Sequence, residues 1–233
     1  MRDERLSIGV TGLDEVIQGG IPFSSTTLLV GPTGVGKTTL GLSFICDSSE
    51  AEPGLIFGFY EDAHRLRRRA KALGLELGAL IDSGVVEVVH HSPTELLQDQ
   101  LAEEIIAEVR RRGVKRLFID GIEGFEAITI HGQRVSSFLL ALVSELRARN
   151  VTTIFTQELP YLPAAPRSRE LPASALFENI FLLKSREIAE RHYRQIAVMK
   201  LRDHGYDASN HTLEISSSGL SLGRSIAEIE KHA

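Results

Sequence analysis

A glycine-rich segment at residues 31–38, with the sequence GPTGVGKT, combines residue types and a spacing that suit phosphate binding. It satisfies the pattern G-x-x-x-x-G-K-[ST], in which backbone N–H groups and the N-terminus of the following helix converge on phosphate oxygens. The Lys37 ammonium group would then reach the β and γ phosphates, and the Thr38 hydroxyl would bind Mg²⁺. We therefore predict an ATP and Mg²⁺ site, with Lys37 also catalytic. The predicted nucleotide-binding residues of this loop are Gly31, Pro32, Thr33, Gly34, Val35, Gly36, Lys37, Thr38 and Thr39.

An aspartate stands at the end of a second apolar segment. In RLFIDG, residues 116–121, Asp120 follows a run that is typical of a buried strand. The ligands of α/β sheets gather at the carboxyl ends of the strands, and a phosphate loop needs a carboxylate on the metal side. Aspartate is also common in the turns that follow strands, so the position of Asp120 alone is weak evidence for a metal-binding role. Together with the loop, it predicts that Thr38 and Asp120 hold the metal.

Two adjacent carboxylates follow a third apolar segment. The tetrapeptide FYED continues the predicted strand at residues 54–61 and makes Glu61 its last residue. From there Glu61 can point across the end of the sheet, near the metal, and orient or deprotonate the attacking water. We therefore predict that Glu61 and Asp62 are catalytic and that Glu61 also lies among the metal-side groups. The alternative for Asp62 is that it caps the helix that follows.

Two cations near the C-terminus lie two residues apart in a predicted strand. In AVMKLRDHG, residues 197–205, strand alternation directs Lys200 and Arg202 to the same face. They are either charges on an exposed edge strand, which discourage unwanted pairing, or groups that are aimed at an anion. The residues alone leave both interpretations open.

The elements that must position these residues alternate between apolar strands and amphipathic helices. Strands are expected at residues 25–31, 54–61, 85–91, 116–121 and 151–158. Helices are expected between them, at residues 37–49, 62–73, about 94–112 and 135–146. Continuous apolar strands that are joined by crossover helices predict an α/β fold, with a mostly parallel central sheet flanked by helices.

A single domain is expected for 233 residues of ordinary globular composition. After residue 158 the segment LPYLPAAPRSRELP carries four prolines and predicts an exposed loop. Short strand-like pieces follow and predict antiparallel hairpins. The expected layout is an N-terminal segment at 1–24, a nucleotide-binding core at 25–158, a Pro-rich loop at 159–175, C-terminal β-hairpins at 176–223, and a polar tail or short helix at 224–233.

The overall charge and the cysteine content narrow the class of protein. A net charge of -5 argues against general affinity for nucleic acids, and the basic run RLRRRAK at residues 65–71 is interpreted as a solvated helix face. The single cysteine, Cys46, cannot form an internal disulfide, which favours a reducing compartment. The sequence has no apolar run of membrane-spanning length and no signal peptide at its charged start. A cytoplasmic protein is expected.

These residues together resemble the KaiC family of RecA-like ATPases over nearly the whole chain. The segment TGLDEVIQGGIP at 11–22 is similar, with different spacing, to the family's T-G-x-x-x-L-D-x-x-x-x-G-G stretch. FYED is similar to the family's paired catalytic carboxylates, with Asp62 in place of a second glutamate. FID is similar to the segment that carries the family's metal-side aspartate, and KLR at 200–202 is similar to its K-[LM]-R. The resemblance implies a RecA-like P-loop NTPase fold with a C-terminal antiparallel β extension.

The resemblance also implies a homohexameric ring with ATP between subunits, in proteins that carry two tandem copies of the domain. Lys200 and Arg202 would then be catalytic cations that reach the γ-phosphate of the neighbouring subunit, and Lys200, Leu201 and Arg202 would bind nucleotide. This chain holds one copy, either as a single-domain member or as part of a longer protein. Residues 203–207 depart from the family's G-T-S-H-like continuation.

The function that the resemblance implies is slow ATP hydrolysis in a signalling, clock-like role, with the chain itself and a signalling protein as partners. Ser174 and Ala175 stand where the family's autokinase has adjacent serine and threonine acceptors, so one acceptor is missing, which argues against self-phosphorylation. Two alternatives stay open. One is a RecA-like or RadA-like recombinase or helicase motor whose Pro-rich loop binds DNA, and the other is a non-hydrolysing ATP sensor for a protein partner.

Overall fold

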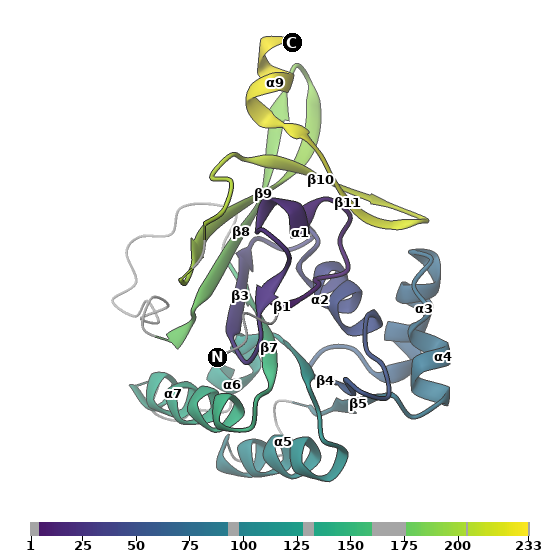
Figure 1. Cartoon of the computed structure of the whole chain (residues 1–233), viewed down its shortest axis with the longest axis vertical. Coiled ribbons are helices and arrows are strands. Elements are labelled where there is room, and N and C mark those ends of the chain that lie inside the picture. The colour runs from purple at the N-terminus through teal and green to yellow at the C-terminus, as the bar shows by residue number, and fades with distance from the viewer. Residues whose placement is uncertain (1–4, 93–97, 128–132, 160–175, 204, 233) are drawn as a thin grey trace.

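The computed structural model describes residues 5–92, 98–127, 133–159, 176–203 and 205–232. Within these ranges the chain forms a nine-stranded central sheet with helices on both faces (Figure 1). The order of its strands is β11-β10-β9-β8-β3-β7-β6-β4-β5. The N-terminal part of the chain therefore contributes a strand near the middle of the sheet, and the C-terminal part contributes one edge.

The strands from β8 to β5 run parallel to one another. In sheet order they are β8 (Asn179–Ile188), β3 (Thr26–Gly31), β7 (Thr152–Glu158), β6 (Arg116–Asp120), β4 (Gly54–Gly58) and β5 (Val86–His90). Beyond β8 the sheet continues antiparallel, with β9 (Arg191–Leu201), β10 (His211–Ser216) and β11 (Gly219–Ser225). Near the N-terminus β1 (Arg5–Leu6) pairs antiparallel with β2 (Ile21–Pro22).

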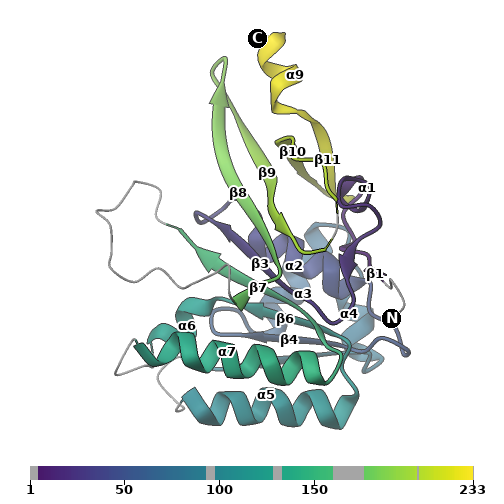
Figure 2. The ribbon, with the colours of Figure 1, turned by 60° about the vertical axis from the view of Figure 1, so that its left-hand side comes forward.

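The helices form two layers, one on each face of the sheet (Figure 2). One layer contains α2 (Lys37–Cys46), α3 (Ala63–Ala72) and α4 (Leu77–Asp82). The other contains α5 (Gln98–Arg112), α6 (Ile122–Ala127) and α7 (Gln133–Ala148). The short helices α1 (Leu13–Val16) and α9 (Ile226–Lys231) lie near the two ends of the chain. The chain thus has the three-layer arrangement that covers a parallel sheet.

Successive side chains of the central strands enter opposite apolar layers. Leu29 and Phe118 pack with the layer of α2, whereas Leu28 and Leu117 pack with the layer of α5 and α7. This alternation follows from the period of two in a strand. A glycine on α2 brings that helix close to the sheet, since a Cβ on Gly41 would lie 2.2 Å from ring carbons of Phe118. The helix that follows the glycine-rich loop is therefore fixed against β6.

The predicted α/β fold with a mostly parallel central sheet is confirmed, but one boundary that matters for function is wrong. The strand predicted at residues 54–61 ends at Gly58, because β4 pairs with β5 and β6 only as far as that residue. Phe59 then turns into the core, and Asp62 begins the next helix. Glu61 is therefore a loop residue and not the last residue of the strand.

The predicted C-terminal antiparallel extension is confirmed, and β8 connects it to the parallel part of the sheet. This strand pairs antiparallel with β9 and parallel with β3, so it belongs to both halves of the sheet. Buried Asn179 reinforces the parallel pairing with β3, because its Nδ2 donates hydrogen bonds of 3.0 Å to Ser25 Oγ, just before β3, and to Thr27 Oγ1 within it. The C-terminal strands are thereby joined to the strand that precedes the glycine-rich loop.

The last residues form a helix, which decides between the two alternatives for the tail. Ser225 caps α9, and Glu228 completes a reciprocal capping box. This helix and the ends of β8 and β9 extend beyond the helical layers (Figures 1 and 2). Helices α1, α4 and α6 were not predicted, and the Pro-rich loop with Ser174 lies outside the described residues apart from Leu159.

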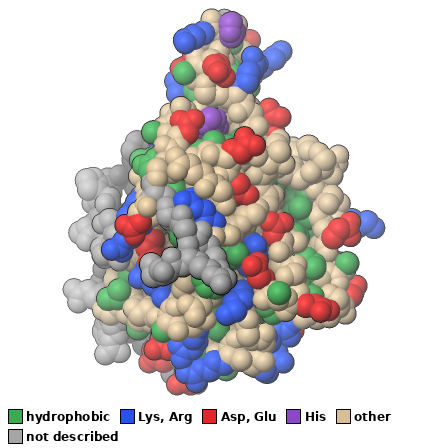
Figure 3. Space-filling view, in the orientation of Figure 1, with side chains coloured by type: hydrophobic (Ala, Val, Ile, Leu, Met, Phe, Trp, Pro, Cys, Tyr) green, Lys and Arg blue, Asp and Glu red, His purple; other side chains and the backbone are tan. Residues whose placement is uncertain are grey.

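Charged side chains of both signs are interspersed over the face drawn in Figure 3. Lys and Arg do not separate there from Asp and Glu into a face of one sign. Such a distribution provides no extended cationic track for a phosphate backbone on that face. Among the helices in the described ranges, none combines the length and the apolarity that crossing a bilayer requires.

Candidate nucleotide-binding site

The glycine-rich loop connects β3 to α2 and turns its lysine inward. Gly36 is the N-cap of α2 and has a φ of 108°, a left-handed conformation that glycine adopts without strain. Lys37 begins the helix, and its Nζ donates to the carbonyl oxygens of Gly31 at 2.7 Å and Pro32 at 2.8 Å. Burial lowers the pKa of Lys37, while nearby carboxylates oppose that shift. The ammonium group is thus held against the loop whose amides would bind phosphate.

The predicted metal-side residues lie next to each other. Thr38 Oγ1 donates to Asp120 Oδ2 at 3.0 Å, and Thr156 Oγ1, from β7, donates to Asp120 Oδ1 at 2.7 Å. Burial raises the pKa of Asp120, and the two hydroxyl hydrogen bonds act against this shift. Hydroxyl and carboxylate oxygens are ligands that suit Mg²⁺. The described residues contain no cluster of three or more His, Cys, Asp or Glu that would form another metal site.

The adjacent carboxylates Glu61 and Asp62 have different surroundings. Asp62 is exposed and caps α3, where its Oδ1 accepts a hydrogen bond of 2.8 Å from the Arg65 amide. This hydrogen bond lowers the pKa of Asp62. Glu61 instead lines a pocket, and its Oε1 accepts a hydrogen bond from Arg69. The capping alternative that the sequence suggested for Asp62 therefore describes its contact in the fold.

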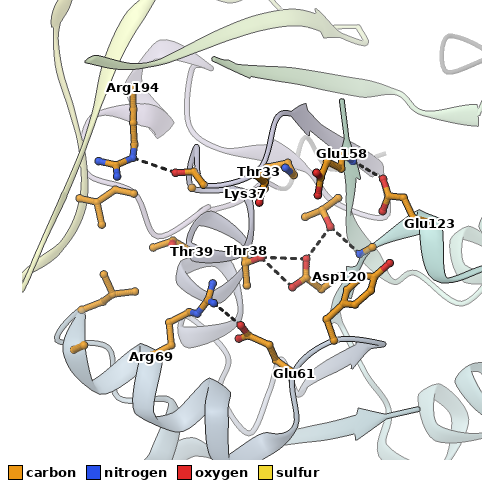
Figure 4. A pocket seen from close by; sticks show the side chains of 18 residues that line it. Thr33, Lys37, Thr38, Thr39, Glu61, Arg69, Asp120, Glu123, Glu158 and Arg194 are labelled. Carbon is orange, nitrogen blue, oxygen red and sulfur yellow. Dashed lines mark hydrogen bonds and ion pairs between the residues drawn. The ribbon is translucent and has the colours of Figure 1, made fainter. Parts of the chain in front are cut away.

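The loop, Glu61 and Asp120 open onto one pocket of about 640 Å³ (Figure 4). This volume lies in the range of small-molecule sites. The pocket sits at the carboxyl ends of β3, β4, β6 and β7, where α/β sheets bind ligands. Its lining residues are Thr33, Gly34, Gly36, Lys37, Thr38, Thr39, Tyr60, Glu61, Arg69, Ala72, Leu73, Asp120, Gly121, Glu123, Thr156, Glu158, Arg194 and Ile215.

The KLR segment at the end of β9 lies outside this pocket. Lys200 Nζ donates to the carbonyl oxygen of Phe177 at 2.7 Å, and Leu201 is buried in the core. The side chain of Arg202 is 62% exposed, with its Nε 3.7 Å from the carboxylate of Asp203. The three predicted nucleotide-binding residues of this segment thus do not line the pocket of their own chain.

Other pocket residues were missed by the sequence reasoning. Glu123, on the unpredicted helix α6, accepts a hydrogen bond from the backbone amide of Glu158, and burial raises its pKa. Arg194 Nε donates to the Gly34 carbonyl oxygen at 3.4 Å. For Glu158 a signal was present, because it ends an apolar strand as Asp120 does. Arg69 could not be recognised as a pocket residue, because it belongs to a basic run that is typical of a solvated helix face.

The fold and the pocket define the class of the protein. A glycine-rich loop links a central parallel strand to a helix, and the neighbouring strands supply Asp120 and Thr156 beside Thr38. This is the arrangement of a RecA-like P-loop NTPase. The family model of the KaiC ATPases matches residues 6–225, and the chain therefore belongs to the KaiC family.

Individual relatives agree with this assignment. The circadian clock oscillator protein KaiC of Nostoc sp. (strain PCC 7120) is 29% identical over 94% of this chain and 44% of its own length. KaiC of Prochlorococcus marinus subsp. pastoris is 31% identical over 87% of this chain and 42% of its own length. The crystal structure of a KaiC-like protein from Pyrococcus horikoshii matches 96% of this chain and all of its own, with a TM-score of 0.84 and 28% identity. The chain spans less than half the length of the two clock oscillator proteins, from Nostoc and Prochlorococcus.

Proposed function

We propose that this domain binds ATP with Mg²⁺ and hydrolyses it slowly between the subunits of a homohexameric ring, in a regulatory, clock-like role. The observation that carries the proposal is the convergence of Lys37, the pair Thr38 and Asp120, and Glu61 on one pocket. The regulatory role is supported by the curated relatives, which are named circadian clock oscillator proteins.

Each residue of the pocket has a separate role in phosphoryl transfer. The loop amides and Lys37 bind the phosphates, and Thr38 and Asp120 would hold Mg²⁺. When bound, Mg²⁺ supplies positive charge that neutralises the phosphate oxygens. Glu61 accepts a hydrogen bond from the attacking water and takes up its proton. Asp62 serves this carboxylate indirectly, because it fixes the start of α3 directly after Glu61.

The cations of the KLR segment complete the site from a neighbouring subunit. Lys200 and Arg202 lie outside the pocket of their own chain, and the side chain of Arg202 is largely exposed. An exposed guanidinium that reaches the phosphates of the next subunit would stabilise the charge that develops in the transition state. We assign Leu201 to the same contact through its backbone, since its side chain is buried.

Assembly that depends on nucleotide tests this proposal. We expect the mass in solution, measured by light scattering, to increase about sixfold from the nucleotide-free chain to the chain with Mg-ATP. A ligand that bridges subunits binds the assembled state more tightly and therefore favours it. A tight ATP complex that stays monomeric would contradict the interfacial site. Single-stranded DNA that stimulates turnover would favour the recombinase or helicase alternative instead.

Arg202→Ala is expected to lower the ATP turnover of the assembled protein at least about 100-fold, because a cation supplied in trans contributes strongly to transition-state stabilisation. Nucleotide affinity should change little, since the loop and Lys37 supply the contacts to the phosphates within one chain. The measurement is steady-state phosphate release at a concentration where the mass confirms assembly. Arg110→Ala, an exposed change on α5, is the control. Unchanged turnover of the assembled Arg202 variant would exclude the trans role.

A further inference from the structure

The carboxylate that we assign to the attacking water is held by an arginine of its own chain. Oε1 of Glu61 accepts a hydrogen bond from the guanidinium of Arg69. Both side chains line the pocket that contains Lys37 and Asp120, and Figure 4 shows the guanidinium turned toward the carboxylate. A hydrogen bond between two charged groups is stronger than a neutral one, so Arg69 competes effectively with other donors for this oxygen.

The local fold brings Arg69 to this place. Asp62 caps α3, and Leu66 and Ala70 are the buried residues that hold the helix against the core. Arg69 directly precedes Ala70, so its side chain leaves the helix at the border of the buried face, beside the loop that carries Glu61. The contact is partly sheltered from solvent, since the side chains of Arg69 and Glu61 are 42% and 21% exposed. A pair of this kind is screened less than a fully exposed one.

A neighbouring pocket borders the same pair of side chains. It has a volume of about 340 Å³ and is lined by Glu61, Arg65, Arg68, Arg69 and Ala72. Arg69 therefore stands between this pocket and the one that contains Lys37. The positive charges of Arg65 and Arg68 repel its guanidinium and favour its contact with Glu61.

We propose that Arg69 restrains ATP hydrolysis by holding Glu61. The inference rests on the proposed function, because it requires that Glu61 acts on water. While paired, the carboxylate is turned toward α3, and its Oε1 is occupied by the guanidinium instead of by water. Slow turnover is then set in part by a residue of α3, outside the phosphate-binding loop.

The test compares variants of the full chain at position 69. For Arg69→Gln we expect kcat for ATP hydrolysis to rise about threefold to tenfold, as suits a partly exposed ion pair. KM should change less than about twofold, because Arg69 contributes to the chemical step and not to phosphate binding. Arg69→Lys retains the cation and should keep kcat near the wild-type value. Arg110→Gln, which makes the same chemical change at an exposed residue of α5 that lines neither pocket, is the matched control and should behave like wild type.

The outcomes separate this inference from the proposed function. Arg69→Met serves as a second neutral variant, and mass and thermal unfolding are matched to wild type before rates are compared. If Glu61→Gln abolishes hydrolysis but both neutral variants at position 69 have an unchanged or lower kcat, the restraint is refuted and the proposed function stands. If Glu61→Gln hydrolyses ATP at the wild-type rate, the assignment of Glu61 fails, and the restraint fails with it.

Discussion

Replacement of Glu61 by glutamine is expected to lower ATP hydrolysis about 100-fold to 10,000-fold, the usual contribution of a positioned general base. The amide has almost the same shape as the carboxylate but cannot take up a proton from water. Binding of ATP should persist, because we assign the contacts to phosphate to Lys37 and the loop. The measurement is single-turnover hydrolysis with the protein in excess over radiolabelled ATP, at a concentration where light scattering shows that the chain is assembled.

Asp62→Asn provides the matched control, since it makes the same chemical change at the adjacent residue. Asparagine caps a helix about as well as aspartate does, so α3 should keep its start and turnover should stay within about threefold of wild type. The pair of variants thus tests whether the two carboxylates have separate roles, as their different contacts indicate. Equal losses in both variants would assign the catalytic role to the two residues together.

Local patterns predicted most of the elements that build the pocket. The loop at residues 31–38 and the apolar strand before Asp120 were identified because their patterns are short and continuous in sequence. A buried parallel strand requires such an apolar run, and a phosphate loop requires glycines at fixed spacing. The end of β4 was misjudged because Phe59 and Tyr60 have high strand propensity, although Phe59 packs into the core beyond the sheet.

The contacts between residues that are distant in the sequence or that lie on different elements could not be predicted from local patterns. Arg69 belongs to a helix with five arginines and lysines among its ten residues, and nothing local distinguishes it from Arg65 or Arg68. Its contact with Glu61 depends on the direction in which the chain leaves β4 and on which face of α3 is buried. The parallel pairing of β8 with β3 likewise depends on Asn179 and its distant partners at the start of β3. Both features depend on tertiary packing, which the local sequence pattern does not determine.

Asp120→Asn is expected to have opposite effects on hydrolysis and on stability. Hydrolysis should fall at least about 100-fold, because an uncharged amide is a poor ligand for Mg²⁺ and the transition-state charge is then less well neutralised. The free energy of unfolding of the nucleotide-free protein should increase by about 1 kcal/mol at pH 7. The second effect follows from the buried position of this carboxylate, and urea unfolding measures it.

The pH dependence gives this stability effect a defined sign. Burial raises the pKa of Asp120, so the folded chain holds the proton more tightly than the unfolded chain does. Its contribution to stability is therefore lost as pH rises from the unfolded value, about 3.9, through the raised folded value. Asparagine carries no charge and avoids this loss. The advantage of Asp120→Asn should accordingly be present at pH 7 and shrink as the pH falls toward about 4, where the aspartate becomes protonated in both states.

Asp207→Asn is the control with the opposite sign. Hydrogen bonds from Ser209 and the neighbouring His211 lower the pKa of Asp207, so its charge stabilises the folded chain at neutral pH. Its replacement should reduce the free energy of unfolding at pH 7, and the reduction should shrink as the pH falls through the lowered folded value. An Asp120 variant that is no more stable than wild type at pH 7 would show that Thr38 and Thr156 fully offset the cost of burial.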